Sequence, residues 1–133
     1  MDDRPRGATV VLVERPTVAR HALARELRAR GHRLFVADTA EHGLYLLLRY
    51  GVDLVVCSDD LAGMSFEPLV AELQARGGPP AVVLTAGASA RDRARVVEEG
   101  AALAVPRGLE PVAVAAHCGA VLRRTRGVVA AVR

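Results

Sequence analysis

The sequence predicts an α/β domain built on an open, doubly wound sheet of five parallel strands. Five short apolar runs alternate along the chain with five stretches of helical periodicity. Most of the runs are apolar throughout, which is typical of parallel strands that are covered by helices on both faces. The connections between runs and helices are short, so right-handed crossovers place helices on both sides of a single sheet.

The strands are expected where the apolar runs lie, at Thr9–Val13, Leu34–Ala37, Leu54–Cys57, Ala81–Leu84 and Leu103–Val105. The helices are expected at residues 17–30, 38–51, 66–76, 89–100 and 110–125. Asp38, three residues before Glu41, has the spacing of a capping box, and Ser89 precedes Asp92 by the same interval. Pro111 fits the first turn of the last helix. Residues 126–133 are expected either to fray or to extend that helix.

Composition indicates one domain over residues 1–133, with its core at about 8–125. Of the 133 residues, 51% are apolar and 25% charged, which is normal for a globular domain. The two cysteines do not make a disulfide framework, and no apolar stretch of signal-peptide length follows the charged segment MDDRPRG, so we expect a cytoplasmic protein with no membrane span. All eighteen basic residues are arginines, scattered among acids and accompanied by few aromatics, which makes nucleic acid an unlikely partner.

Polar residues follow the strands at the edge where such a sheet places its site. Glu14 and Arg15 follow the first strand, Ser58 follows the third, Thr85 follows the fourth and Arg107 follows the fifth by one residue. The segments Val52–Ser58 and Leu61–Met64, together with Gly100-Ala101, resemble those of receiver domains in bacterial two-component response regulators. The resemblance covers residues 8 to about 125, and it implies the strand order 2-1-3-4-5.

The resemblance departs from the family pattern at the residues that carry phosphoryl chemistry. It implies an acid pair after the first strand, a phosphoacceptor aspartate ending the third, a hydroxyl ending the fourth and a lysine after the fifth. Matched positions here are Glu14 and Arg15, then Ser58, Thr85 and Arg107. Only the hydroxyl, Thr85, is unchanged in kind.

These departures predict a site without magnesium. Glu14, Arg15, Ser58 and Arg107 sum to a formal charge of +1, whereas Mg²⁺ requires carboxylate oxygens. The Ser58 hydroxyl is a poor nucleophile because no histidine or lysine is placed to activate it. Asp59 and Asp60 are alternative acceptors if the register is shifted. In an extended chain Asp59 faces away from Ser58, and both acids are interpreted as turn residues in solvent. An ion pair of Glu14 with Arg107 or Arg15 is also expected.

The resemblance therefore implies a pseudo-receiver: a signalling module that is not an enzyme, needs no cofactor and acts through protein–protein contacts. The expected contact surface for a protein partner or a second copy is formed by the fourth helix, the fifth strand and the fifth helix. The residues expected there are Arg91, Arg93, Arg95, Glu98, Glu99 and Ala104. Two alternatives remain open: a sensor that binds a small molecule or anion through Arg15, Arg107, Ser58 and Thr85, and a receiver phosphorylated on Asp59 or Asp60.

Overall fold

A computed structural model shows the predicted sheet, with five parallel strands in the order β2-β1-β3-β4-β5. It describes residues 7–61, 66–86 and 89–132, and the side chains of these residues as far as 125. The strands are β1 (Thr9–Val13), β2 (Arg33–Ala37), β3 (Leu54–Ser58), β4 (Ala81–Thr85) and β5 (Leu103–Pro106). The helices are α1 (Val18–Ala29), α2 (Ala40–Arg49), α3 (Phe66–Ala75), α4 (Ala90–Glu98) and α5 (Pro111–Val132).

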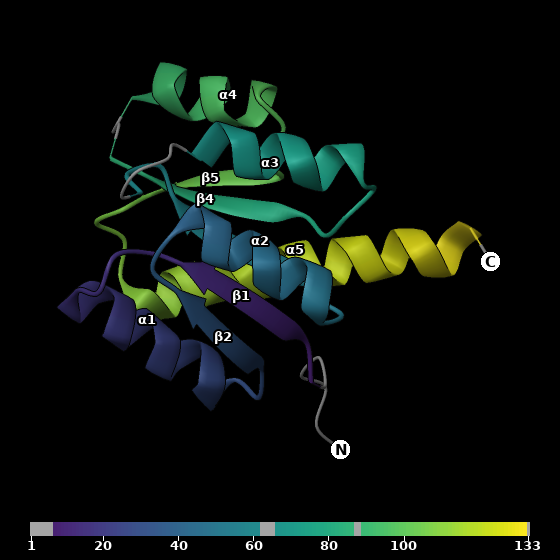
Figure 1. Cartoon of the computed structure of the whole chain (residues 1–133), viewed down its shortest axis with the longest axis horizontal. Coiled ribbons are helices and arrows are strands. Elements are labelled where there is room, and N and C mark those ends of the chain that lie inside the picture. Colours follow the sequence, from purple (N-terminus) through teal and green to yellow (C-terminus); the bar gives the residue numbers. More distant parts are fainter. Residues whose placement is uncertain (1–6, 62–65, 87–88, 133) are drawn as a thin grey trace.

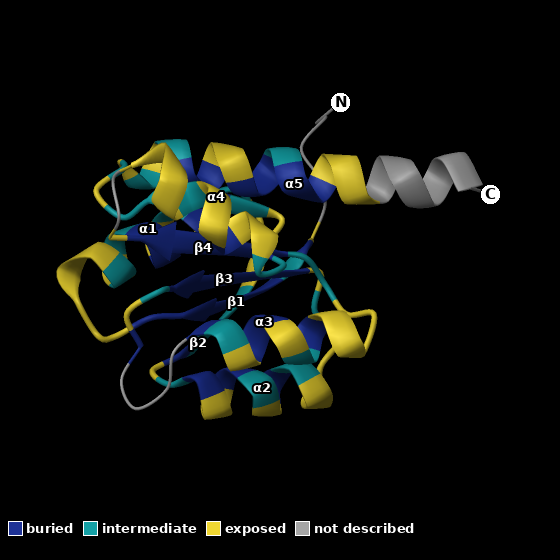
Figure 2. Ribbon diagram, turned by 90° about the horizontal axis from the view of Figure 1, so that it is seen from above, coloured by how far each residue is buried: buried dark blue, intermediate teal, exposed yellow. Residues whose placement is uncertain are grey.

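The helices form two layers, one on each face of the sheet (Figure 1). One core cluster joins the sheet to α1 and α5, and the other joins it to α2, α3 and α4. The inner strands β1, β3 and β4 lie between these layers and are buried almost throughout (Figure 2). This burial on both faces explains why their sequences are almost entirely apolar.

Successive residues of the inner strands point to opposite layers. In β1, β3 and β4 the odd-numbered core residues belong to the cluster with α2, α3 and α4, and the even-numbered ones belong to the cluster with α1 and α5. The register of β3 and β4 places Ser58 opposite Leu84. The residues that follow them, Asp59 after Ser58 and Thr85 after Leu84, therefore lie on the same side of the sheet as the odd-numbered core residues.

Side-chain caps begin three of the helices. Thr17 caps α1 and Ser89 caps α4, each accepting a backbone N–H through its side-chain oxygen, as the sequence pattern indicates. The expectation that Asp38 begins the second helix is wrong by one residue, because Thr39 caps α2 by accepting the His42 N–H. Asp38 is instead paired with Arg20 of α1.

The last helix continues past the expected end at residue 125. The backbone of α5 is helical to Val132, so residues 126–132 extend the helix and are not a frayed tail. Within the part of the chain that the structure describes, no helix has both the length and the apolar character needed to cross a membrane.

Candidate functional site

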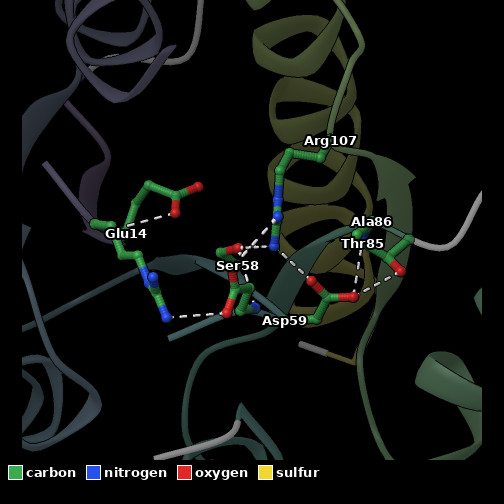
Figure 3. A network of polar contacts seen from close by, with 8 residues as sticks. Glu14, Ser58, Asp59, Thr85, Ala86 and Arg107 are labelled. Carbon is green, nitrogen blue, oxygen red and sulfur yellow. Dashed lines mark hydrogen bonds and ion pairs between the residues drawn. The ribbon is translucent and has the colours of Figure 1, made fainter. Parts of the chain in front are cut away.

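The predicted site residues meet at the carboxyl edge of the sheet. Glu14 directly follows β1, Ser58 ends β3, Thr85 ends β4 and Arg107 directly follows β5. Figure 3 shows Ser58, Asp59, Thr85 and Arg107 in one connected polar network, with Glu14 beside it. The network also contains Asp59, whose side chain the sequence interpretation placed away from the site.

Arg107 is the centre of this network. Its Nη2 donates to Ser58 Oγ at 2.5 Å and to Asp59 Oδ1 at 2.6 Å, and its Nη1 lies 3.8 Å from Asp60 Oδ2. Its backbone N–H donates to the Thr85 carbonyl at 2.8 Å, which fixes the start of the loop after β5 beside the end of β4. One guanidinium group thus connects the end of β5 to the end of β3 and to the loop that follows β3.

Asp59 binds the end of β4 through one carboxylate oxygen and the Arg107 guanidinium through the other. Oδ2 accepts the Thr85 hydroxyl at 2.9 Å and the Ala86 N–H at 3.1 Å, while Oδ1 accepts Arg107 Nη2. The Asp59 N–H still pairs with the Leu84 carbonyl, so the residue continues the β3–β4 ladder beyond the end of β3. Its side chain is only 21% exposed.

The interpretation of Asp59 as a solvent-facing turn acid is therefore wrong. Asp59 does lie on the opposite side of the strand from Ser58, but Thr85 lies on that same side because of the β3–β4 register. Arg107 is long enough to reach both residues from the end of β5. The Asp60 side chain is half-exposed, as expected, although it is paired with arginine.

Ser58 is fully buried, and its hydroxyl is occupied. The oxygen accepts Arg107 Nη2 and, at 3.2 Å, the Asp60 N–H. The Ser58 side chain is also among the neighbours that lower the pKa of the Glu14 carboxyl. The hydroxyl therefore makes contacts with two neighbouring loops and presents no free face to solvent.

Glu14 is a buried carboxylate without the predicted side-chain ion pair. Burial raises the pKa of Glu14 above its usual value, and this outweighs the opposing effects of the Arg15 N–H, the charge of Arg107 and the Ser58 side chain. Glu14 Oε1 accepts the backbone N–H of Arg15 at 3.1 Å. The Arg15 guanidinium turns to Asp60 Oδ1, also at 3.1 Å. Both arginines thus pair with the acids after β3, which corrects the expected pairing with Glu14.

The formal charge of the site differs from the expected +1, because that value left out Asp59 and Asp60. The carboxylates of Glu14, Asp59 and Asp60 and the guanidinium groups of Arg15 and Arg107 leave a formal charge of −1. Among the described residues, no three histidine, cysteine or acidic side chains are placed so that they could hold a metal ion. Burial raises the pKa of the neighbouring Cys57 thiol to about 12, which disfavours the thiolate form that reacts.

The predicted contact residues of α4 lie mostly at the surface. Arg91, Arg95 and Glu98 are exposed, and Arg93 and Glu99 are partly exposed. Ala104, in contrast, is buried in β5 and belongs to the core cluster that includes Val96, so its side chain is not part of the surface. Val96 is the single buried residue of α4.

Comparison with known proteins supports the same family. The two-component response regulator PhoP of Pseudomonas aeruginosa is 32% identical over 121 residues, which cover 90% of this chain and 54% of PhoP. The chain thus spans about half the length of the curated relative it matches. No family model matches the chain.

Solved structures share the fold at lower identity. A CheY-like receiver domain protein from Methanospirillum hungatei JF-1 has a TM-score of 0.81 at 18% identity, over 91% of this chain and 98% of that one. An orphan response regulator of H. pylori has a TM-score of 0.76 at 24% identity, over 89% and 99% of the two chains. The non-phosphorylated HemR receiver domain from Leptospira biflexa has a TM-score of 0.76 at 25% identity, over 86% and 94%. The sequence similarity to PhoP and the shared fold together support a response regulator receiver (CheY-like) domain.

Proposed function

We propose that this receiver domain serves two-component signalling without accepting a phosphoryl group, and that it acts by binding a protein partner or a second copy of itself. The observation that carries the proposal is the state of Ser58, the residue that the resemblance matches to the phosphoacceptor. Its hydroxyl is fully buried and is held by Arg107 and by the Asp60 N–H. A phosphoryl donor has no path to this oxygen while these contacts persist.

The surroundings of Ser58 also disfavour transfer. Among the described residues we take Glu14 as the candidate base, because the Ser58 side chain is one of the neighbours that lower the pKa of its carboxyl. A base activates a nucleophile only if the second reactant reaches it, and Ser58 has no exposed surface. We therefore assign Ser58 and Glu14 a structural role in connecting β1 with β3, and we propose that the domain is not an enzyme.

The pairing of the charged groups supports a site that functions without magnesium. Arg15 lies where the resemblance places a metal-binding acid, and its guanidinium pairs with Asp60. Arg107 pairs with Asp59 at 2.6 Å. A divalent cation bound by Asp59 and Asp60 would have to displace the guanidinium groups that pair with them and then remain beside two positive charges.

The runner-up is a receiver phosphorylated on Asp59, because this carboxylate contacts Thr85 and Arg107. Its two oxygens, however, already accept three hydrogen bonds of 2.6–3.1 Å. A phosphoryl group on either oxygen would have to separate Asp59 from the donors that hold it. The anion-sensor alternative is weakened for a similar reason, since the arginines expected to bind the anion are paired with Asp59 and Asp60.

Phosphoryl uptake tests the proposal directly. The domain is incubated with acetyl phosphate and Mg²⁺, and covalent phosphate is measured by intact mass. Amide spectra are recorded in parallel with Mg²⁺ and beryllium fluoride. A matched variant, R15D/S58D/R107K, restores the residue types of the family pattern at three positions. We expect no uptake by the natural chain and uptake by the variant, which establishes that the assay works on this scaffold.

Uptake by the natural chain overturns the proposal. The variants D59N and D60N then identify the acceptor, because only the one that carries it abolishes uptake. The proposed contact face is tested by light scattering on the natural chain and on R91E/R95E, since these two exposed arginines lie on α4. A self-association that the substitutions abolish supports a symmetric dimer, and an association that they leave unchanged excludes this part of α4 from the contact.

A further inference from the structure

The three donors that hold Asp59 come from two points of the chain, the end of β4 and the loop after β5, and converge on one carboxylate (Figure 3). They are the hydroxyl of Thr85, the N–H of Ala86 and the guanidinium of Arg107, at 2.9, 3.1 and 2.6 Å. All three donate, and one carries a positive charge. We refer to these three groups as the anion cradle.

The cradle is built from rigid parts of the fold. Thr85 is buried at the end of β4, and the Arg107 N–H is bonded to the Thr85 carbonyl, so both residues are fixed by the β4–β5 edge. Preorganised donors of this kind bind oxyanions well because little conformational freedom is lost on binding. The Asp59 side chain, in contrast, enters the cradle from the loop that follows β3.

We infer that Asp59 is a tethered anion that fills this cradle and excludes small oxyanions such as inorganic phosphate from it. The inference deepens the proposed function and rests on it, because the carboxylate can hold the cradle permanently only if Asp59 is not itself a phosphoacceptor. Because the Asp59 carboxylate is attached to the chain, it competes for the three donors at a high effective concentration, so free phosphate does not displace it. Without the Asp59 carboxylate these three donors lose the bonds that they make to it, and phosphate can accept the same three bonds.

Phosphate binding to D59A tests the inference. Inorganic phosphate is titrated into D59A and into the natural chain at constant ionic strength, and the amide signals of Thr85, Ala86 and Arg107 are followed. We expect saturable shifts at these amides in D59A and binding at least about tenfold weaker in the natural chain, because a charge-assisted hydrogen bond contributes that much or more. The double variant D59A/R107A should lose the binding.

The matched control is E72A. Glu72 of α3 pairs with Arg76, the residue that follows the helix, and both side chains are exposed. E72A therefore also frees an arginine from a carboxylate, but at a site outside the cradle. Phosphate binding to D59A alone supports the inference. Equal binding to E72A and D59A means that any freed arginine attracts phosphate, and this overturns it.

The remaining outcomes separate this inference from the proposed function. A folded D59A that binds no phosphate overturns the inference alone, provided that the natural chain takes up no phosphoryl group from acetyl phosphate. Phosphorylation of the natural chain on Asp59 overturns both. If D59A does not fold, D59S replaces it, because serine is shorter than aspartate and leaves room for the anion. Absence of phosphate binding to folded D59S then counts against the inference in the same way.

Discussion

Replacement of Arg107 by alanine should destabilise the domain more than removal of any exposed arginine. The substitution removes the two short bonds to Ser58 and Asp59 and the longer pairing with Asp60. The carboxylates of Glu14, Asp59 and Asp60 would remain at the edge of the sheet together with the Arg15 guanidinium, which pairs with Asp60. The formal charge of the site would therefore change from −1 to −2.

The size of the effect follows from the exposure of the pair. The Arg107 and Asp59 side chains are 33% and 21% exposed, which places them between a surface ion pair and a buried one. Surface pairs contribute about 0.2–1 kcal/mol, and breaking a buried pair costs about 3–5 kcal/mol. We therefore expect R107A to lower the free energy of unfolding by about 2 kcal/mol. For a chain of this length that corresponds to a Tm about 8 °C lower.

Urea unfolding followed by far-UV circular dichroism measures this difference. The control is R76A, which removes an exposed arginine paired with Glu72 one helical turn away and should cost no more than about 0.5 kcal/mol. Added salt should erase the small R76A effect and leave most of the R107A effect, because partly buried charges are less screened. An R107A variant as stable as R76A would refute the view that Arg107 holds the strand ends together.

Three further predictions concern Glu14, Gly43 and the two cysteines. E14Q should be more stable than the natural chain at pH 8, and the difference should shrink towards pH 4 in urea unfolding. Burial raises the folded-state pKa of Glu14 above the usual 4.5, so the stability that this carboxyl contributes is present below pH 4.5 and is lost as pH rises through the raised value. G43A should lower the Tm, because the added Cβ would lie 2.7 Å from Cγ2 of the buried Val13; we expect about 1–2 kcal/mol after the gain in helix propensity. Cys57 and Cys118, both with a pKa of about 12, should resist Ellman's reagent at pH 8 in the folded domain and react fully in urea.

The sequence predicted the sheet and most helix boundaries because these depend on local patterns. Each predicted strand overlaps an observed one, and Thr17 and Ser89 begin their helices as expected. At the second helix two adjacent residues, Asp38 and Thr39, are both good caps. The choice between them depends on Arg20, a residue of another helix that pairs with Asp38. Local spacing does not contain that information.

The sequence predicted where the site lies in the sheet but not which of its side chains pair with one another. The sequence placed Ser58, Thr85 and Arg107 at one edge, and the structure brings them together. The pairing of Asp59 with Thr85 depends on the register between β3 and β4, which apolar runs do not reveal. The choice of Asp59 and Asp60 over Glu14 by the two arginines depends on side-chain reach across the edge. Strand alternation alone could not anticipate either result.

The single buried residue of α4 sets how independently this helix can move. Burial of one valine contributes about 1.5–3 kcal/mol, whereas α1 and α5 each bury several side chains in the core. The amide hydrogens of α4 should therefore exchange with solvent through local opening, well before those of β3 or β4 exchange through global unfolding. A protein bound across Arg91 and Arg95 would slow this exchange, so hydrogen–deuterium exchange can report occupancy of the face even when no covalent mark distinguishes the two states.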